Sequence, residues 1–249
     1  MNNIAQIRKM AAMALIIGSC SLAAEAATAG DETSSSAVAH TLSARQQAIP
    51  PIAAFMASSN MEKLDKALNQ GLDAGLTVNE TKEILVQLYA YTGFPRSLNA
   101  LSALMKVTEA RKRQGITDEL GKEPSQPIPV GDALRQLGTD NQTKISGAPV
   151  QGPLFEFAPV INQFLQSHLF GDIFARDNLD WQSRELATVG ALAATPGVEA
   201  QLLSHTRASL RVGITRGQLQ QVVQILRASG ETQAAARVET ALRATQNVN

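Results

Sequence analysis

The sequence predicts an all-α protein in which a helical hairpin has been duplicated and the two copies pack as a pseudo-dimer. Three observations support this prediction. Apolar residues recur every three or four positions through most of the chain, the spacing that places them on one face of a helix. A helix–turn–helix pattern at 64–88 recurs 138 positions later. No segment shows the sustained alternation of apolar and polar residues that is typical of strands, which favours the all-α class.

The repeated pattern carries the residues that end one helix and begin the next. Each copy has a glycine where a helix ends in the left-handed region, which glycine adopts without strain. A Thr-x-x-Glu or Thr-x-x-Gln capping box follows, in which both side chains bond to free backbone amides at the start of a helix. These residues explain a duplicated core, so function is expected from polar residues carried on it. The matched pairs are Leu64 and Leu202, Leu72 and Leu210, Gly75 and Gly213, Thr77 and Thr215, Glu80 and Gln218, and Leu88 and Leu226.

The N-terminal residues are typical of an export signal rather than of a folded element. Two basic residues precede an apolar run too short to span a bilayer, and small residues offer cleavage sites near Ala26 or Ala29. We therefore expect residues 1–29 to be a signal peptide and residues 30–45 a flexible spacer, with the protein exported to the periplasm. Lipidation of Cys20, which would anchor the protein to a membrane, is the alternative.

The first repeat is expected at 46–114. Its predicted helices are 46–58, 61–73, 77–91 and 97–113. Pro50 and Pro51 are expected in the opening turn of the first helix, where proline is tolerated. Asn60 is expected to cap the second helix.

A proline- and glycine-rich segment at 115–153 separates the two repeats and is expected to be a linker, with one or two helical turns near 131–138. The second repeat is expected at 154–245. Its predicted helices are 154–174, 182–194, 198–212, 215–227 and 232–245.

Composition excludes several classes of function. The chain has 22 basic and 22 acidic residues, so its charge gives no reason to expect nucleic acid or an anionic membrane as a partner. Cys20 is the only cysteine and lies within the predicted signal. A disulfide, a thiolate nucleophile and a cysteine-ligated metal are therefore not expected in the mature protein. His168 and Asp172 are four residues apart, but no third ligand is evident, so no metal site is expected.

Segments in both halves of the chain resemble the carboxymuconolactone decarboxylase family. In the second half these are residues 170–194, which include Arg184-Glu185-Leu186, followed by 201–205 and 213–215. In the first half the segment 75–96 is similar to the helix-to-turn signature of that family. The resemblance implies small helical units that assemble as trimers or hexamers, and hence a homo-oligomer.

The resemblance also implies a choice between two chemistries. One branch of the family, typified by alkyl hydroperoxidase D, uses a Cys-x-x-Cys motif followed by a histidine, with a glutamate upstream. Here the histidine corresponds to His205 and the nearest acid to Glu185, but the cysteine positions hold Val198 and Gln201. The other branch decarboxylates its substrate without a cofactor, and Arg184 with His205 resembles that branch more closely.

The candidate catalytic residues are His205, Arg184 and Glu185. An imidazole transfers protons near neutral pH, and an arginine can hold a substrate carboxylate through two parallel hydrogen bonds. Structural alternatives remain open: His205 as a core or interface histidine, Arg184 in a salt bridge at the helix start, and Glu185 as a partner of the helix dipole. Ala67 occupies the position of His205 in the first copy.

The candidate substrate-binding residues come from both halves. Glu83, Tyr91 and Arg96 lie in the first copy, and Asp172 lies in the second. Asp172 could instead pair with Arg176, four residues later. A composite site formed by both halves is the resulting hypothesis.

Three functions are compatible with the sequence. The first is an exported, cofactor-free lyase of the decarboxylase type that acts on a small carboxylated or lactone-like metabolite. The second is a relative of the antioxidant branch that has lost its thiol chemistry. The third is a non-catalytic oligomer that binds a small ligand. We expect an enzyme of the first kind, without cysteine-dependent peroxidase activity.

Overall fold

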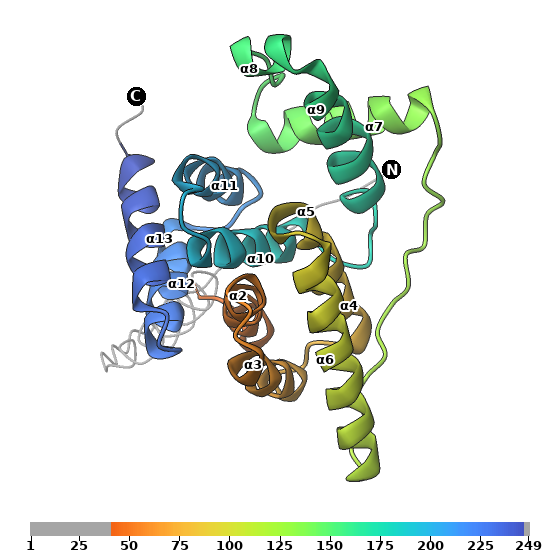
Figure 1. Cartoon of the computed structure of the whole chain (residues 1–249), viewed down its shortest axis with the longest axis vertical. Coiled ribbons are helices and arrows are strands. Elements are labelled where there is room, and N and C mark those ends of the chain that lie inside the picture. The colour runs from red at the N-terminus through yellow and green to blue at the C-terminus, as the bar shows by residue number, and fades with distance from the viewer. Residues whose placement is uncertain (1–40, 247–249) are drawn as a thin grey trace, which may run out of the picture. The chain divides into compact units, whose positions relative to one another are not determined.

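A computed structural model describes residues 41–246, and the part of the chain that it describes consists of helices and their connections, without strands (Figure 1). The predicted all-α class is therefore confirmed. The predicted signal peptide, its cleavage sites and Cys20 lie outside the described residues. In the described part of the chain, each helix is too short or too polar to span a lipid bilayer.

Two helices of equal length, α2 (Ala44–Ala57) and α10 (Trp181–Ala194), pack against each other at the centre of the fold (Figure 1). Their contact is close because small residues face each other. A Cβ atom at Gly190 would lie 2.6 Å from the Pro50 carbonyl oxygen and 3.2 Å from the Ala53 side chain. Most of α10 is buried, which is unusual for a helix that carries an arginine and a glutamate.

Three helices complete the first half: α3 (Met61–Asp73), α4 (Val78–Gln87) and α6 (Phe94–Arg113), with the short α5 (Tyr89–Thr92) between the last two. Asn60 caps α3 through the Lys63 amide, as predicted. The Thr77 capping box at α4 is also confirmed, because Thr77 and Glu80 exchange hydrogen bonds between side chain and backbone. Gly75 adopts a φ of 91°, in the region that favours glycine.

The second half ends with α11 (Glu199–Arg211), α12 (Arg216–Ala228) and α13 (Thr232–Ala244). These helices begin 138 positions after α3, α4 and α6, and α10 begins 137 positions after α2. The Thr215 capping box is confirmed at α12. The matching bounds support the predicted duplication, which nevertheless stays a prediction.

The position of the two prolines was predicted wrongly. Helix α2 begins at Ala44, capped by Ser43, so Pro50 and Pro51 lie in its middle rather than in its opening turn. The sequence expectation placed the start of the helix at residue 46 because it overlooked the Ser43–Gln46 capping box. Pro50 lies at the close contact with α10, where its carbonyl oxygen and Cα atom face Gly190.

The segment 115–153 contains more helix than expected. Instead of one or two turns it holds α7 (Asp132–Ser146), which has 15 residues and packs against the π-helix η1 (Leu165–Ile173). Its Gly138 touches the Gln166 backbone so closely that a side chain would not fit. The extended part of the segment also supports α4, because the Val78 and Asn79 amides donate to the Glu119 and Leu120 carbonyl oxygens.

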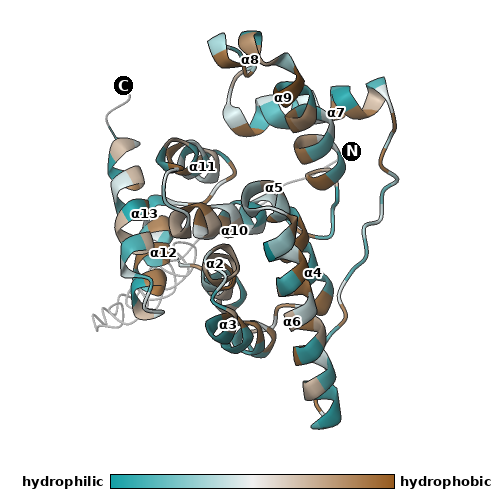
Figure 2. Ribbon diagram, viewed as in Figure 1, coloured by the Kyte–Doolittle hydropathy of each residue, from teal (hydrophilic) through white to brown (hydrophobic). Residues whose placement is uncertain are grey.

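The single helix expected at 154–174 is broken into α8 (Pro153–Phe157), α9 (Pro159–Phe164) and η1. Pro159 explains the first break, since it cannot continue a helix from the preceding residue. Apolar stretches of α8 and α9 are visible in Figure 2. Leu154, Phe157, Val160 and Phe164 in these helices are exposed.

Candidate functional site

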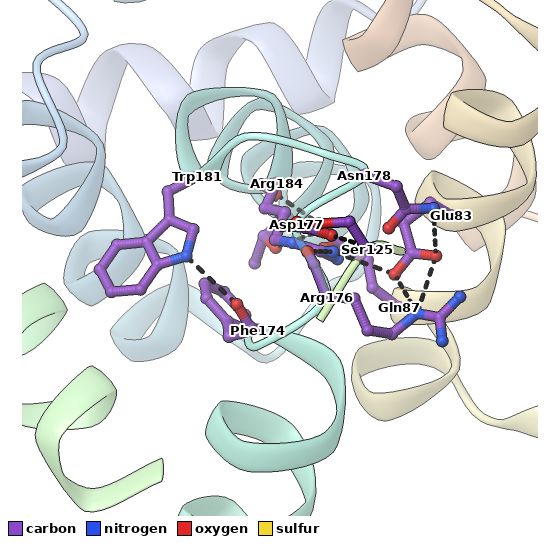
Figure 3. A network of polar contacts seen from close by, with 10 residues as sticks. Glu83, Gln87, Ser125, Phe174, Arg176, Asp177, Asn178, Trp181 and Arg184 are labelled. Carbon is purple, nitrogen blue, oxygen red and sulfur yellow. Dashed lines mark hydrogen bonds and ion pairs between the residues drawn. The ribbon is translucent and has the colours of Figure 1, made fainter. Parts of the chain in front are cut away.

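A buried ion pair between the two halves forms the centre of the polar site (Figure 3). Arg184, in the first turns of α10, has a side chain that is 0% exposed, and Glu83 of α4 is 2% exposed. The Arg184 Nη2 atom donates to Glu83 Oε1 at 3.0 Å. Desolvation lowers the pKa of the Arg184 guanidinium, and the charge of Glu83 opposes that effect. Each charge is therefore kept in the interior by the other.

Further polar groups surround this ion pair. Gln87, one helical turn after Glu83, accepts from Arg184 Nη1 at 3.0 Å and donates to the Arg184 carbonyl oxygen at 2.8 Å. The Arg176 Nε atom donates to both oxygens of Glu83, at 2.9 and 3.0 Å, and Asn178 donates to Oε2 at 3.2 Å. The loop between η1 and α10 thus binds the same carboxylate as Arg184, as Figure 3 shows.

Neighbouring contacts hold this loop in place. The Trp181 indole donates to the Phe174 carbonyl oxygen, and the Arg184 guanidinium lies 5.7 Å from the Phe174 ring centroid. Ser125, from the extended segment before α7, donates its backbone amide to Asp177 at 2.8 Å (Figure 3). The hydrogen bonds from Ser125 lower the pKa of Asp177.

A histidine–glutamate pair lies on another side of α10. His205 Nδ1 is 2.9 Å from Glu185 Oε2, and the two side chains are 16% and 0% exposed. Consecutive residues of a helix point about 100° apart. Arg184 therefore reaches α4 while Glu185 reaches α11, and both are buried because α10 is surrounded. With Nδ1 held by Glu185, Nε2 is the nitrogen of His205 that can exchange a proton with a bound molecule.

Tyr91 connects this pair to the first half. Its ring meets the His205 ring edge to face, with centroids 5.3 Å apart. The Tyr91 hydroxyl and Glu185 Oε1 are both buried without a regular hydrogen bond within residues 41–246. Burial raises the pKa of Tyr91 above its ordinary value of 10.0, and the negative charge of Glu185 raises it further. Glu185 Oε1 is thus buried with unused bonding capacity, and the Tyr91 hydroxyl is buried next to Thr188.

The structure does not bring all the candidate residues to this place. Arg96 donates to the Ser59 hydroxyl and to the Thr92 carbonyl oxygen. Asp172 pairs with His168 at 2.7 Å on the exposed side of η1. The anticipated alternative pair between Asp172 and Arg176 is absent, because Arg176 binds Glu83 instead.

Sequence reasoning missed several groups that complete the cluster: Gln87, Arg176, Asn178 and Thr188. The Thr188 hydroxyl accepts from Gln87 Nε2 at 3.5 Å. One signal for Gln87 was available, because Glu83 and Gln87 are four residues apart and thus share a face of α4 with buried apolar residues. Within residues 41–246, no three His, Cys, Asp or Glu side chains are arranged to hold a metal ion.

One known protein family matches part of the chain. Residues 159–247 match the carboxymuconolactone decarboxylase family. The match spans α9 to α13 and includes Arg176, Arg184, Glu185 and His205, whereas Glu83, Gln87 and Tyr91 lie outside it. No curated protein matches the chain.

Proposed function

We propose that the chain, whose residues 159–247 match the carboxymuconolactone decarboxylase family, is a cofactor-free lyase of the decarboxylase type that acts on a small carboxylated or lactone-like metabolite. The observation that carries the proposal is the contact between His205 and Glu185. A histidine oriented by a buried carboxylate is a general acid/base whose tautomer is fixed.

In a decarboxylation, this pair would supply the proton that replaces carbon dioxide on the substrate. The bond between the substrate carbon and its carboxylate breaks, carbon dioxide leaves, and the electron pair passes into the conjugated carbonyl system. His205 Nε2 then donates a proton to the substrate carbon and is reprotonated from solvent. Glu185 stabilises the charged imidazolium. Because it holds Nδ1, it keeps Nε2 directed away from its own carboxylate and available to the substrate. No redox partner is needed.

Arg184 has a different role in this proposal from the carboxylate anchor expected from the sequence. Its terminal nitrogens are already bound to Gln87, Glu83 and the Arg176 carbonyl oxygen. A substrate carboxylate would have to displace Glu83 from a site with no exposed surface. We therefore treat Arg184 as a positioning residue that fixes the start of α10, and with it Glu185.

The thiol route of the related peroxidases conflicts with the composition of the chain. That chemistry needs two cysteines, and the sequence has only Cys20. Catalysis by His205 and Glu185 needs none. A peroxidase assay with a dithiol donor is accordingly expected to show no turnover.

Single substitutions in the pair test the proposal. His205→Gln should reduce carbon dioxide release from a panel of small carboxylated lactones about 100-fold or more, the usual contribution of a general acid/base. Glu185→Gln should reduce it less, because the imidazole remains. His168→Gln, which alters an exposed histidine on η1, is the matched control and should leave the rate unchanged. Full activity of His205→Gln would overturn the proposal.

A second candidate function is a homo-oligomer that binds a ligand without turnover. The exposed apolar residues of α8 and α9 favour association with another copy, since monomers rarely leave such clusters uncovered. Sedimentation of the wild type and of the double variant Phe157→Ser with Phe164→Ser tests this association.

Export to the periplasm is also a proposal, and it is tested by fractionation of cells that express the full chain.

A further inference from the structure

The polar site has a counterpart in the other half of the chain. Because α10 begins 137 positions after α2, and α11 and α12 begin 138 positions after α3 and α4, each site residue has an equivalent position. Small or apolar residues occupy most of these positions. The pairs are Arg184 and Gln47, Glu185 and Ala48, Thr188 and Pro51, His205 and Ala67, Gln87 and Ile225, and Tyr91 and Ser229.

A cavity of about 530 Å³ is found at this equivalent place, between α2, α3 and the end of α12. All six counterpart residues line it. The polar site is filled by an arginine, a glutamate, a histidine and a tyrosine, whereas here an amide, two alanines and a serine leave the volume open. The cavity therefore arises from truncation of the same side chains that build the polar site, and its size suits a small molecule.

The chemistry of the lining selects the ligand. Pro51, Phe55, Ala67 and Ile225 form an apolar wall, and the only charged residues in the lining are Lys63 and Lys66. No acidic side chain belongs to the lining, so its formal charge is positive. Such a cavity favours a ligand with an apolar body and a single negative charge.

Both lysines can reach such a charge. Lys66 is exposed and pairs with Glu62 one turn earlier, a type of surface pair that is weak and easily exchanged. The Lys63 ammonium lies 5.2 Å from the centroid of the Phe55 ring and bonds to Glu231 and the Ser229 carbonyl oxygen. An ammonium has three donors, so one remains for a ligand.

We propose that the cavity between α2, α3 and α12 binds a small amphipathic monocarboxylate, separately from the polar site at His205. The apolar body packs on Phe55, Pro51 and Ile225, and the carboxylate faces Lys63 and Lys66. The chain then has one polar site and one binding cavity at equivalent positions of its two halves.

Calorimetric titration of the full chain with hexanoate tests the proposal, with hexanol and hexylammonium as uncharged and cationic probes. We expect saturable binding of hexanoate, at least about fivefold weaker binding of hexanol, and no binding of hexylammonium. Lys66→Gln should weaken hexanoate binding about threefold to tenfold, an effect that added salt should diminish.

Two cavity-filling variants locate the site. Ala67→Leu places a larger side chain at the buried wall, and Ala228→Leu does so at an exposed lining position where the fold is less at risk. Each should reduce hexanoate affinity at least about tenfold, whereas His205→Gln should leave it unchanged. The proposal is overturned if hexanoate does not bind, if Ala228→Leu in a folded chain binds it normally, or if His205→Gln abolishes binding. Because the binding readout is independent of turnover, failure here is distinguishable from failure of the lyase proposal.

Discussion

Tyr91 places a phenol in a buried position beside the carboxylate of Glu185, and this determines its titration. Burial first, and the negative charge of Glu185 second, raise the pKa of Tyr91 above its ordinary value of 10.0. Ultraviolet absorbance at increasing pH should therefore show a delayed phase from Tyr91, one of the two tyrosines of the sequence. Tyr91→Phe should remove the delayed phase, and Tyr89→Phe should leave it. A delayed phase that survives Tyr91→Phe would contradict the assignment.

The same shift has a consequence for stability. A group whose pKa is higher in the folded than in the unfolded chain favours the folded chain below the unfolded value, and this contribution is lost as the pH rises above it. The Tyr91 contribution should therefore be complete below about pH 10 and decline at higher pH. The midpoint of urea unfolding should fall less between pH 9 and about pH 11 in Tyr91→Phe than in the wild type.

At the level of elements, the contact between α2 and α10 leaves no room for a side chain at Gly190. The nearest atom to an added Cβ is the Pro50 carbonyl oxygen, which belongs to the backbone and cannot turn aside. We expect Gly190→Ala to lower the free energy of unfolding by about 1–3 kcal/mol, as overpacked cores do. Gly217→Ala, at an exposed position in α12, is the control and should be neutral or stabilising by about 1 kcal/mol. Equal stability of Gly190→Ala and wild type would contradict this account.

The sequence predicted those elements whose ends are set by nearby residues. Asn60, Thr77 and Thr215 mark helix starts through contacts within three residues, so the starts of α3, α4 and α12 were predicted within one residue. The single helix expected at 77–91 is instead divided into α4 and α5. Helix α7 was underestimated because its residues are largely polar and it is stabilised by packing on η1, a tertiary contact that no local pattern reveals. The break at Pro159 was likewise missed because the apolar spacing continues across it.

For the site, the sequence named Arg184, Glu185, His205 and Glu83 as candidates but did not predict which of them pair. Arg184 and Glu83 are 101 residues apart, and Arg176 and Glu83 are 93 apart. Such pairs depend on how α4 packs against α10, and a single sequence gives no measure of that. Arg96 and Asp172 are polar residues near the motif, yet Arg96 binds Ser59 and the Thr92 carbonyl oxygen, and Asp172 binds His168 within η1.

At the level of the whole molecule, the ion pair between Glu83 and Arg184 links the two halves, and its two charges are not equally dependent on it. Glu83 also binds Arg176 and Asn178, so it keeps partners when Arg184 is removed. Arg184 is fully buried, and Glu83 is its only acidic partner within residues 41–246. Loss of Glu83 therefore leaves the buried guanidinium of Arg184 without an acidic partner. Loss of Arg184 does not leave Glu83 without a basic partner.

We expect Glu83→Gln to lower the free energy of unfolding by about 3–5 kcal/mol, and Arg184→Met by less. The double variant should recover part of the lost free energy of unfolding, since the unpaired charge of Arg184 is then absent. Urea unfolding, followed by circular dichroism and by the fluorescence of Trp181 in the second half, gives these values. Arg227→Gln, which breaks an exposed pair with Glu239, is the control and should change stability by about 0.5 kcal/mol or less. A larger loss in Arg184→Met than in Glu83→Gln would show that the carboxylate, rather than the guanidinium, depends on the contact between the halves.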